Sequence, residues 1–417
     1  MILSVVILIY FILLLVVDFK KGIVISAMTV QMLSYLGTGI PNVKLFFLLS
    51  IIAFVLYPVN RKILSTDAYP KWLAWASGVF LLSFTLTTIN SGYMHWQTVV
   101  INAFSYFFFP FVFWKSLTSQ KQVNRALNIL VKLMTIAVVF GVIEAFFKKN
   151  LLFDFIQNAF TLEDFSFDDD RIRFGLKRCN SIFSYFSTYG IAAFMTFIVL
   201  YVRCFLLYHK SQWEPKLMIL CAFAAFSTGS RAIFLGLFLA CYLLLCNKEF
   251  LKSKFGMNLL SLAFLLLPIL VVVGYQVVDS MINSDTSKFA SGSTSELRTI
   301  QWEACLPYFL DSPILGNGRL YIWDVVKAAH YELLGAESIW FSIMVDYGLL
   351  GALAFLFLIY SCCKELFKYN WRLISLPIGY LLILSLSPDT GITYNTLLCF
   401  TVLIIRMFQF SSKKCES

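Results

Sequence analysis

Charged side chains are scarce in this chain: Asp, Glu, Lys and Arg together make up 13% of its 417 residues. Hydrophobic residues make up 59%, and the mean hydropathy is +0.80. A soluble fold cannot bury that much apolar surface, so these values exclude a soluble enzyme and predict a polytopic membrane protein. No small-residue cleavage site follows the apolar N-terminal segment, so we expect a retained helix rather than a signal peptide.

Motifs for nucleotides and metals are also missing. The sequence has neither a P-loop nor a Rossmann glycine loop, and no Cys-x-x-Cys or histidine-rich spacing. Most cysteines lie inside apolar runs, and only Cys179 and Cys305 fall in predicted outer loops, where oxidation could join them. Because these motifs are missing, we expect no cofactor and no metal. We also expect no nucleic acid, because the net charge of +10 mostly reflects membrane topology. The substrate must therefore reach the membrane in an activated form.

Apolar runs long enough to cross a bilayer define the organisation of the chain. The expected fold is all-α, a polytopic transmembrane helix bundle of about 12–13 spans that forms one integral membrane domain over residues 1–417. The pairs 23–58 and 215–247 are the least certain, and a single bent helix is the alternative for the second pair. The thirteen runs are 2–17, 23–39, 43–58, 72–89, 96–115, 126–146, 185–208, 215–229, 230–247, 258–278, 338–362, 373–387 and 392–409.

Basic residues gather in alternate connections between these runs, and cytoplasmic connections are the ones that carry such an excess. This pattern predicts a periplasmic N-terminus, a cytoplasmic C-terminus and two large outer loops, 147–184 and 279–337. The inner basic residues are Lys20, Lys21, Arg61, Lys62, Lys71, Lys115, Lys121, Arg125, Arg203, Lys210, Lys216, Lys248, Lys252, Lys254, Lys364, Lys368, Arg372, Lys413 and Lys414.

The turn STGSR (227–231) opens the span that begins near residue 230. A Ser or Thr of this turn can cap the helix, whose N-terminus offers free N–H groups and a partial positive charge. Arg231 adds a guanidinium that can bind two oxygens of one phosphate. Because basic interfacial anchors favour the inner face, we predict that Arg231 binds phosphate or diphosphate instead of serving as such an anchor.

The second outer loop contains the largest polar stretch of the chain, residues 293–318. Capping-box spacing and apolar residues at helical intervals predict an amphipathic helix from about 294 to 310. Arg298 and Trp302 lie one turn apart on it, so the guanidinium can stack on the indole or reach past it to a phosphate. Pairing of Arg298 with a nearby glutamate in solvent is the alternative. The Gly-Asn-Gly at 316–318 allows a tight turn or a close backbone approach to a ligand.

The first outer loop carries three consecutive aspartates, residues 168–170, and then several basic residues just before a span. The aspartates resemble the acidic metal motif of nucleotide-sugar transferases, but the supporting nucleotide-binding fold is missing. We therefore expect them to balance their basic neighbours. Arg178 lies closest to the membrane, and we predict that it binds an anionic substrate, with Arg173 as a further candidate.

Acidic residues mark the span that follows the second outer loop. Glu337 lies at its start and can act as a general base on a sugar hydroxyl or cap the helix. Asp346 lies deeper, where an ionisable group is a functional candidate by default, and we expect it to pair with a buried polar group or to orient an arginine. Glu144 is a further candidate for the same pocket, and His330 is expected to have no catalytic role.

Three segments together resemble the bacterial O-antigen polymerase and ligase superfamily. STGSRAIFLGLF (227–238) is similar to its Ser/Thr-x-Ser-Arg turn before an apolar helix. LRTIQWEACLPYFLDSPILGNG (297–318) is similar to the arginine, tryptophan, proline and Gly-x-Gly pattern of its large periplasmic loop, and KRCNSIFSYFSTYG (177–190) to the arginine-plus-serine start of an earlier span. With the many-span layout, the resemblance covers most of the sequence. It implies a GT-C-like bundle with a partly helical large periplasmic loop.

The chain departs from the ligase pattern at one position. Ligases of this superfamily place a His-Asn pair eleven residues before the first glycine of a Gly-x-x-Gly, with an acidic residue between. Counting back from Gly348 gives Glu337 and Ser338 here, with Asp346 in the acidic position. The ligase histidine is absent, which favours a polymerase, although Glu337 could replace it as a base.

The resemblance implies a metal-independent glycosyltransferase at the periplasmic face of the bacterial inner membrane. Its donor is a glycan chain linked to undecaprenyl diphosphate, and its acceptor is a hydroxyl of the next lipid-linked repeat. Membrane lipid, a chain-length regulator and a flippase are further partners to consider. The catalytic residues would be Arg231, Arg298 and Glu337, and the residues that bind diphosphate or sugar would be Arg178, Arg173, Trp302 and Asp346.

Two alternatives remain open from the sequence. The first is an O-antigen ligase, which transfers the finished chain to lipid A core. The second is a polysaccharide flippase or another transporter. Transporters often have repeated halves and charges near the bilayer midplane, neither of which is clear in this chain.

Overall fold

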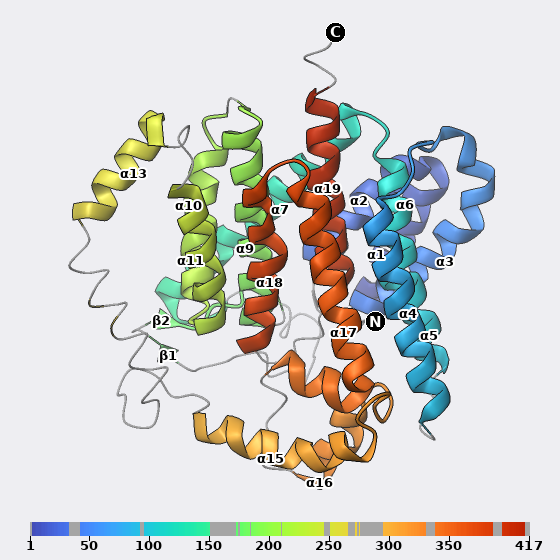
Figure 1. The fold of residues 1–417 in the computed structure, drawn as a ribbon. Coiled ribbons are helices and arrows are strands. Elements are labelled where there is room, and N and C mark those ends of the chain that lie inside the picture. Colours follow the sequence, from blue (N-terminus) through green and yellow to red (C-terminus); the bar gives the residue numbers. More distant parts are fainter. Residues whose placement is uncertain are drawn as a thin grey trace.

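The computed structural model describes most of the chain as a helix bundle (Figure 1). The prediction of an all-α fold is confirmed, with one short addition: the two-residue strands β1 (Ile172–Arg173) and β2 (Leu176–Lys177) pair antiparallel. The described residues are 2–32, 42–91, 96–150, 172–173, 176–183, 185–209, 211–245, 251–265, 272, 275, 295–330, 338–386 and 394–412.

Each of the thirteen predicted spans coincides with at least part of a described helix. Three of the predicted spans contain or border π-helical or 3₁₀ turns: η2 and η3 are π-helices, and η5 is a 3₁₀ helix. The helices of the first half are α1 (Ile2–Val17), α2 (Phe19–Met32), α3 (Asn42–Asn60), η1 (Arg61–Ile63), α4 (Lys71–Asn90), α5 (Trp96–Asn102), η2 (Ala103–Phe108), α6 (Phe109–Ser116), α7 (Gln120–Phe147), α9 (Phe186–Tyr201) and η3 (Val202–Leu206). Those of the second half are α10 (Glu214–Ser227), α11 (Arg231–Leu245), α13 (Lys254–Leu265), α15 (Ser295–Asp311), η4 (Ile322–Val326), α16 (Lys327–Ala329), α17 (Ile339–Phe367), η5 (Trp371–Ile374), α18 (Ser375–Leu386) and α19 (Tyr394–Ser412).

Length and hydropathy allow seven helical stretches of the described chain to cross a membrane, and three shorter apolar stretches accompany them. The chain is thus a multi-pass membrane protein. The seven are Leu45–Ile63, Lys71–Asn90, Val99–Ser116, Gln120–Phe147, Phe186–Leu206, Ile339–Phe367 and Tyr394–Ser411, and the shorter ones are Leu8–Val17, Arg231–Leu243 and Trp371–Leu386.

Helices α10 and α11 form a hairpin, so the alternative of a single bent helix over 215–247 is wrong. The chain leaves α10 at Ser227 and starts α11 at Arg231, and Gly229 between them has φ +61°. Glycine adopts this left-handed conformation without the steric cost of a Cβ atom. Figure 1 shows the two helices side by side. The turn predicted within the other uncertain pair, 37–42, lies almost entirely outside the described residues.

The core of the bundle surrounds α9. Every residue of α9 except Thr188 is buried, and the helix packs against α7, α10, α11, α18 and α19. A helix that is largely apolar on all sides suits such a central place. Gly190 is one reason for the close packing, because a Cβ atom there would lie 1.9 Å from the Ile233 side chain of α11. Helix α9 therefore holds the 177–183 segment, which precedes it, against the start of α11.

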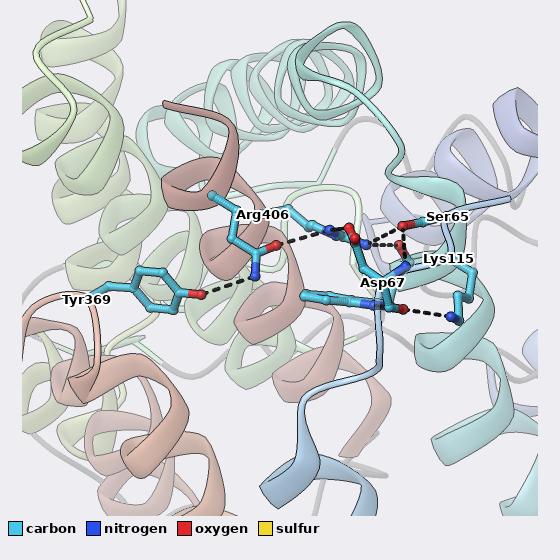
Figure 2. Close-up of polar contacts among 7 residues, drawn as sticks. Ser65, Asp67, Lys115, Tyr369 and Arg406 are labelled. Atoms are coloured by element: carbon cyan, nitrogen blue, oxygen red, sulfur yellow. Dashed lines mark hydrogen bonds and ion pairs between the residues drawn. The ribbon is translucent and has the colours of Figure 1, made fainter. Parts of the chain in front are cut away.

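One end of the bundle gathers connections that the basic-residue pattern assigns to the cytoplasm (Figure 2). Ser65 donates its backbone N–H to the Lys115 carbonyl (2.8 Å), and the Lys115 ammonium donates to the Asp67 carbonyl (2.6 Å). Gln409 of α19 donates to the Tyr369 hydroxyl (3.2 Å). The loops after α3, α6 and α17 thus meet the end of α19. Their common location agrees with the predicted alternation of loops, while the orientation of this end relative to the membrane stays a prediction.

Arg406 joins these connections from a buried position in α19. Its side chain is 1% exposed and stacks on the Trp114 ring, with 3.6 Å between the guanidinium carbon and the ring centroid. The guanidinium pairs with the Asp67 carboxylate and donates to the Ser65 hydroxyl (3.1 Å) and the Trp114 carbonyl (3.3 Å). A third side chain, Gln409, accepts another of its hydrogen bonds (3.0 Å).

We expect Arg406→Met to destabilise the protein by about 1–3 kcal/mol, because it removes these charge-assisted hydrogen bonds but keeps apolar contact with Trp114. The cost stays moderate because the Asp67 side chain is 50% exposed and can be solvated after its partner is lost. Thermal unfolding in detergent measures the effect. Arg125→Met is the matched control, since Arg125 donates to Gln122 of the same helix. An unchanged unfolding temperature for Arg406→Met would contradict the role of this cluster.

Candidate functional site

The opposite end of the bundle contains α15, α16 and the first turns of α11 and α17 (Figure 1). Its framework is a set of backbone hydrogen bonds between residues 313–318 and a break in α17. Leu349 donates to the Pro313 carbonyl (2.9 Å), and Leu350 donates to the Ile314 carbonyl (3.0 Å). In the other direction, Asn317 donates to the Val345 carbonyl (3.0 Å). The loop thereby replaces the hydrogen bonds that α17 would make with itself.

Two glycines make this contact possible. Gly348 has φ +63° and interrupts α17, and a Cβ atom on it would lie 2.5 Å from the Ile314 carbonyl oxygen. Gly316 has φ +74°, and a Cβ atom there would lie 2.4 Å from the Asp346 carbonyl oxygen. The predicted tight turn at 316–318 is confirmed. The close backbone approach it allows is to α17 itself.

Asp346 holds the turn that follows. Its side chain is buried, and its two carboxylate oxygens accept the backbone N–H groups of Leu320 (2.9 Å) and Ile322 (3.0 Å). A carboxylate that accepts two backbone hydrogen bonds is stabilised in its charged form. Asp346 was expected to pair with a buried polar group, and the groups that it binds are backbone N–H groups. In this structure Asp346 therefore positions the 318–322 turn.

Arg178 connects two of the three sequence motifs. Its Nε donates to the Thr228 carbonyl (3.3 Å), and its guanidinium carbon lies 3.3 Å from the centroid of the Phe186 ring. One residue further on, Cys179 donates its N–H to the Ser227 carbonyl (3.1 Å). The 177–183 segment and the turn before α11 are thus bonded to each other, as a shared site requires.

Glu144, near the end of α7, holds the 177–183 segment in place. The carboxylate is buried, and its Oε2 accepts the N–H groups of Asn180 (3.0 Å) and Ser181 (2.7 Å) and the amide of Asn150 (3.2 Å). These bonds hold the chain just after Arg178 in one conformation. Glu144 therefore acts here as a structural clamp, which sequence reasoning, with Glu144 as a pocket candidate, did not foresee.

Arg298 and Trp302 lie on α15, whose observed bounds, Ser295–Asp311, match the predicted helix closely. Arg298 Nη2 donates to the carbonyl of Leu386, the last residue of α18 (3.2 Å). Trp302 packs against Phe341, with 5.7 Å between ring centroids. At the start of α17, Trp340 Nε1 donates to Ser385 Oγ (2.9 Å). Helix α15 is thus fixed to the start of α17 and the end of α18.

The remaining predicted residues are described less completely. Arg231 is the first residue of α11 and is partly buried, and α11 packs closely along α18, whose last residue binds Arg298. Arg231 and Arg298 therefore belong to the same end of the bundle. Arg173 lies in β1, where only its backbone is described, and Glu337 lies outside the described residues. His330 contacts the Tyr308 ring at 6.2 Å and belongs to the packing of the loop.

The two outer cysteines are free, so the suggested bridge between them is wrong. Burial raises the pKa of the Cys179 thiol to about 12 and that of the Cys305 thiol to about 11. Cys305 packs in a separate small cluster with Ile322, Val326 and Phe341. No group of three or more His, Cys, Asp and Glu side chains that could hold a metal occurs in the part of the chain that the structure describes.

Arg319 is a charged residue of this end that sequence reasoning missed. It directly follows the Gly-Asn-Gly turn, and it is partly buried. Burial lowers the pKa of its guanidinium, but Tyr106, Tyr347 and the Asp346 carboxylate act in the opposite direction, and the net shift is upward. The group is therefore charged at any physiological pH. The one hint in the sequence is that Arg319 lies in the same predicted loop as Arg298, although no motif or helical spacing marks it.

The fold and these contacts define a multi-pass, all-α membrane protein with arginines gathered at one end of its bundle. Residues 216–356 match a family model described as O-antigen ligase. The matched segment runs from α10 to the middle of α17, includes Arg231, Arg298, Trp302 and Asp346, and confirms the resemblance to the O-antigen polymerase and ligase superfamily. No curated protein matches the chain.

Proposed function

We propose that the protein is a polysaccharide polymerase of the O-antigen type. It transfers a glycan chain linked to undecaprenyl diphosphate onto the next lipid-linked repeat, at the periplasmic face of the inner membrane. The observation that carries the proposal is the meeting of three arginine-bearing segments at one end of the bundle, through the Arg178–Thr228 and Arg298–Leu386 hydrogen bonds. Arginines gathered at one end of a membrane bundle suit a substrate with concentrated negative charge.

The chemistry follows from the leaving group. The acceptor hydroxyl oxygen attacks the anomeric carbon of the donor chain, the bond from that carbon to the phosphate oxygen breaks, and undecaprenyl diphosphate leaves with the electron pair. The hydroxyl proton passes to a general base, for which Glu337 is our candidate. Arg231, Arg298 and Arg178 bind the negative charge that grows on the departing diphosphate, and this lowers the barrier electrostatically.

The surrounding contacts keep these arginines in place before the substrate arrives. Arg178 is held by Phe186 on one side and by the Thr228 carbonyl on the other, and the segment after it is fixed by Glu144. Preorganised charges stabilise a transition state without a reorganisation cost during the reaction. Neither ATP nor a metal ion is required in this mechanism, because the diphosphate ester already carries the free energy of transfer.

The second candidate is an O-antigen ligase, which the description of the matching family favours. The two activities differ in their acceptor: a lipid-linked repeat for the polymerase, and lipid A core for the ligase. The residue at the position of the ligase histidine is Glu337 here. This difference is our reason for preferring the polymerase.

Deletion of the gene distinguishes these functions on a gel of surface polysaccharide. Loss of a polymerase should leave core that carries a single repeat, whereas loss of a ligase should leave bare core. Loss of a flippase should trap undelivered repeats inside the cell. The proposal predicts the first pattern, restored to long chains by the intact gene on a plasmid, and long chains in the deletion strain would refute it.

A further inference from the structure

The backbone on both sides of Arg319 is fixed. Gly318 donates its N–H to the Asp346 carbonyl (3.0 Å), and Leu320 donates its N–H to the Asp346 carboxylate (2.9 Å). Leu320 has φ +63°, a left-handed conformation that is costly for a leucine, by about 1–3 kcal/mol. Such a conformation persists only where neighbouring bonds enforce it, and it is concentrated at functional sites. Arg319 thus stands at the apex of a turn that the structure holds rigid.

A continuous arc of aromatic rings lies beside this turn. The ring centroids of Tyr106 and Tyr394 are 5.3 Å apart, those of Tyr394 and Phe80 are 4.8 Å apart, and Phe80 contacts Phe84 at 4.7 Å. Phe84 in turn contacts Tyr347 at 4.6 Å. The arc draws on four elements, η2, α19, α4 and α17, and all five rings are buried. It presents Arg319 with a wall of low polarity in which three members carry a hydroxyl.

The aromatic rings carry no formal charge, so they do not neutralise the positive charge of the Arg319 guanidinium. Its electrostatic partners are Tyr106, Tyr347, Tyr394 and Asp346, and no hydrogen bond or ion pair joins its guanidinium to any residue that the structure describes. The two Asp346 carboxylate oxygens accept the N–H groups of Leu320 and Ile322. No guanidinium nitrogen of Arg319 is among the fully buried atoms of the described chain that lack a hydrogen-bond partner, so its N–H donors reach the surface. They can therefore donate to an acceptor that comes from outside the chain.

We propose that Arg319, backed by Tyr106, Tyr347 and Tyr394, forms a saccharide subsite that recognises an oxyanion attached to a sugar. The oxyanion is either a uronate carboxylate within the repeat or the diphosphate at the reducing end of a lipid-linked repeat. A guanidinium binds both groups through two parallel hydrogen bonds. The apolar rings exclude water and strengthen that attraction, and aromatic side chains suit contact with the faces of sugar rings.

This subsite deepens the proposed function and rests on it. A polymerase holds two lipid-linked substrates at once, and each brings its own negative charge. Arg178, Arg231 and Arg298 lie at the ends of α9, α11 and α18, whereas the electrostatic partners of Arg319 belong to η2, α17 and α19. Separate groups of basic residues allow the two charged substrates to be bound side by side with each charge neutralised.

Direct binding to purified protein in nanodiscs of neutral lipid tests the subsite without requiring transfer. The probes are farnesyl diphosphate, a trisaccharide that ends in glucuronate, and the same trisaccharide with glucose in its place. We expect Arg319→Gln to weaken binding of at least one anionic probe by about tenfold or more, with Arg319→Lys intermediate. Binding of the neutral trisaccharide should not change. The anionic probe that is affected identifies the source of the oxyanion.

Lys327→Gln is the matched control, because Lys327 is an exposed cation of the same loop that lies over the Trp323 ring. It should bind all probes as the parent protein does. Size-exclusion profiles and thermal unfolding establish that Arg319→Gln is folded. Binding of both anionic probes by folded Arg319→Gln within about twofold of the parent protein, or no binding of either by the parent, would overturn the subsite. The gel phenotype of the deletion strain tests the proposed polymerase separately.

Discussion

Arg231→Ala should reduce the rate of chain transfer by roughly 10²–10³-fold, because it removes a preorganised positive group from the charge that develops on the leaving diphosphate. The position of Arg231 at the first residue of α11 combines its guanidinium with the free N–H groups of a helix N-terminus. Reconstituted protein and a purified lipid-linked repeat allow the lengthening of the glycan to be followed on gels over time.

Two further variants make this result specific. Arg231→Lys keeps the charge but loses the planar fork, so we expect an intermediate rate. Arg125→Ala, at the other end of the bundle, removes an arginine that binds only Gln122 among the residues described, and it should leave the rate unchanged. A rate for folded Arg231→Ala within a few-fold of the parent protein would exclude this arginine from the mechanism.

Gly348→Ala should destabilise the protein by roughly 3 kcal/mol or more and prevent recovery of most of it in folded form. The added Cβ atom would lie 2.5 Å from the Ile314 oxygen and 2.7 Å from the Gly316 nitrogen. Both are backbone atoms that cannot rotate away, and the φ of +63° is itself unfavourable for alanine. The clash therefore has to separate the 313–318 segment from α17.

Gly78→Ala is the matched control, because Gly78 lies inside α4 and a Cβ atom there would meet nothing within 4 Å. Alanine favours a helix over glycine by about 1 kcal/mol, so this variant should be as stable as the parent or more so. Fluorescence-detected size exclusion and thermal unfolding compare the two. Gly348→Ala with the stability of the parent protein would show that the loop is held by other contacts.

Much of the fold was predictable because a bilayer imposes a simple pattern on the sequence. Apolar length located helices in all thirteen predicted ranges, and seven of these helical stretches are long and apolar enough to cross a membrane. Capping-box spacing with helical periodicity placed the helix at 294–310, close to its observed bounds. The choice between a hairpin and a bent helix at 215–247 was harder, since it depends on one φ angle, that of Gly229. Short irregularities such as the π-helix η2 leave no comparable signal.

Sequence reasoning predicted which segments lie near the candidate site better than it predicted the individual hydrogen bonds there. Sequence reasoning selected Arg178, Arg231 and Arg298, and the structure brings their segments together at one end. It could not assign partners to acidic residues, because Asp346 and Glu144 bind backbone N–H groups that are distant in sequence and carry no side-chain pattern. Arg319 was missed because no helical partner or motif marks it, although its loop was the correct place to search.

The bonds between the Pro313–Gly318 segment and α17 also bear on how such an enzyme can change its substrate. They tie down the chain just before Arg319, and Ser338 fixes it again at the start of α17, where its side chain accepts the Trp340 N–H (3.3 Å). A segment anchored at both ends tolerates insertions well, since doubling its length adds only about 0.6 kcal/mol of closure entropy. Insertions between Ile322 and Glu337 can therefore change this stretch while the anchored segments on both sides, and the candidate base Glu337, are kept.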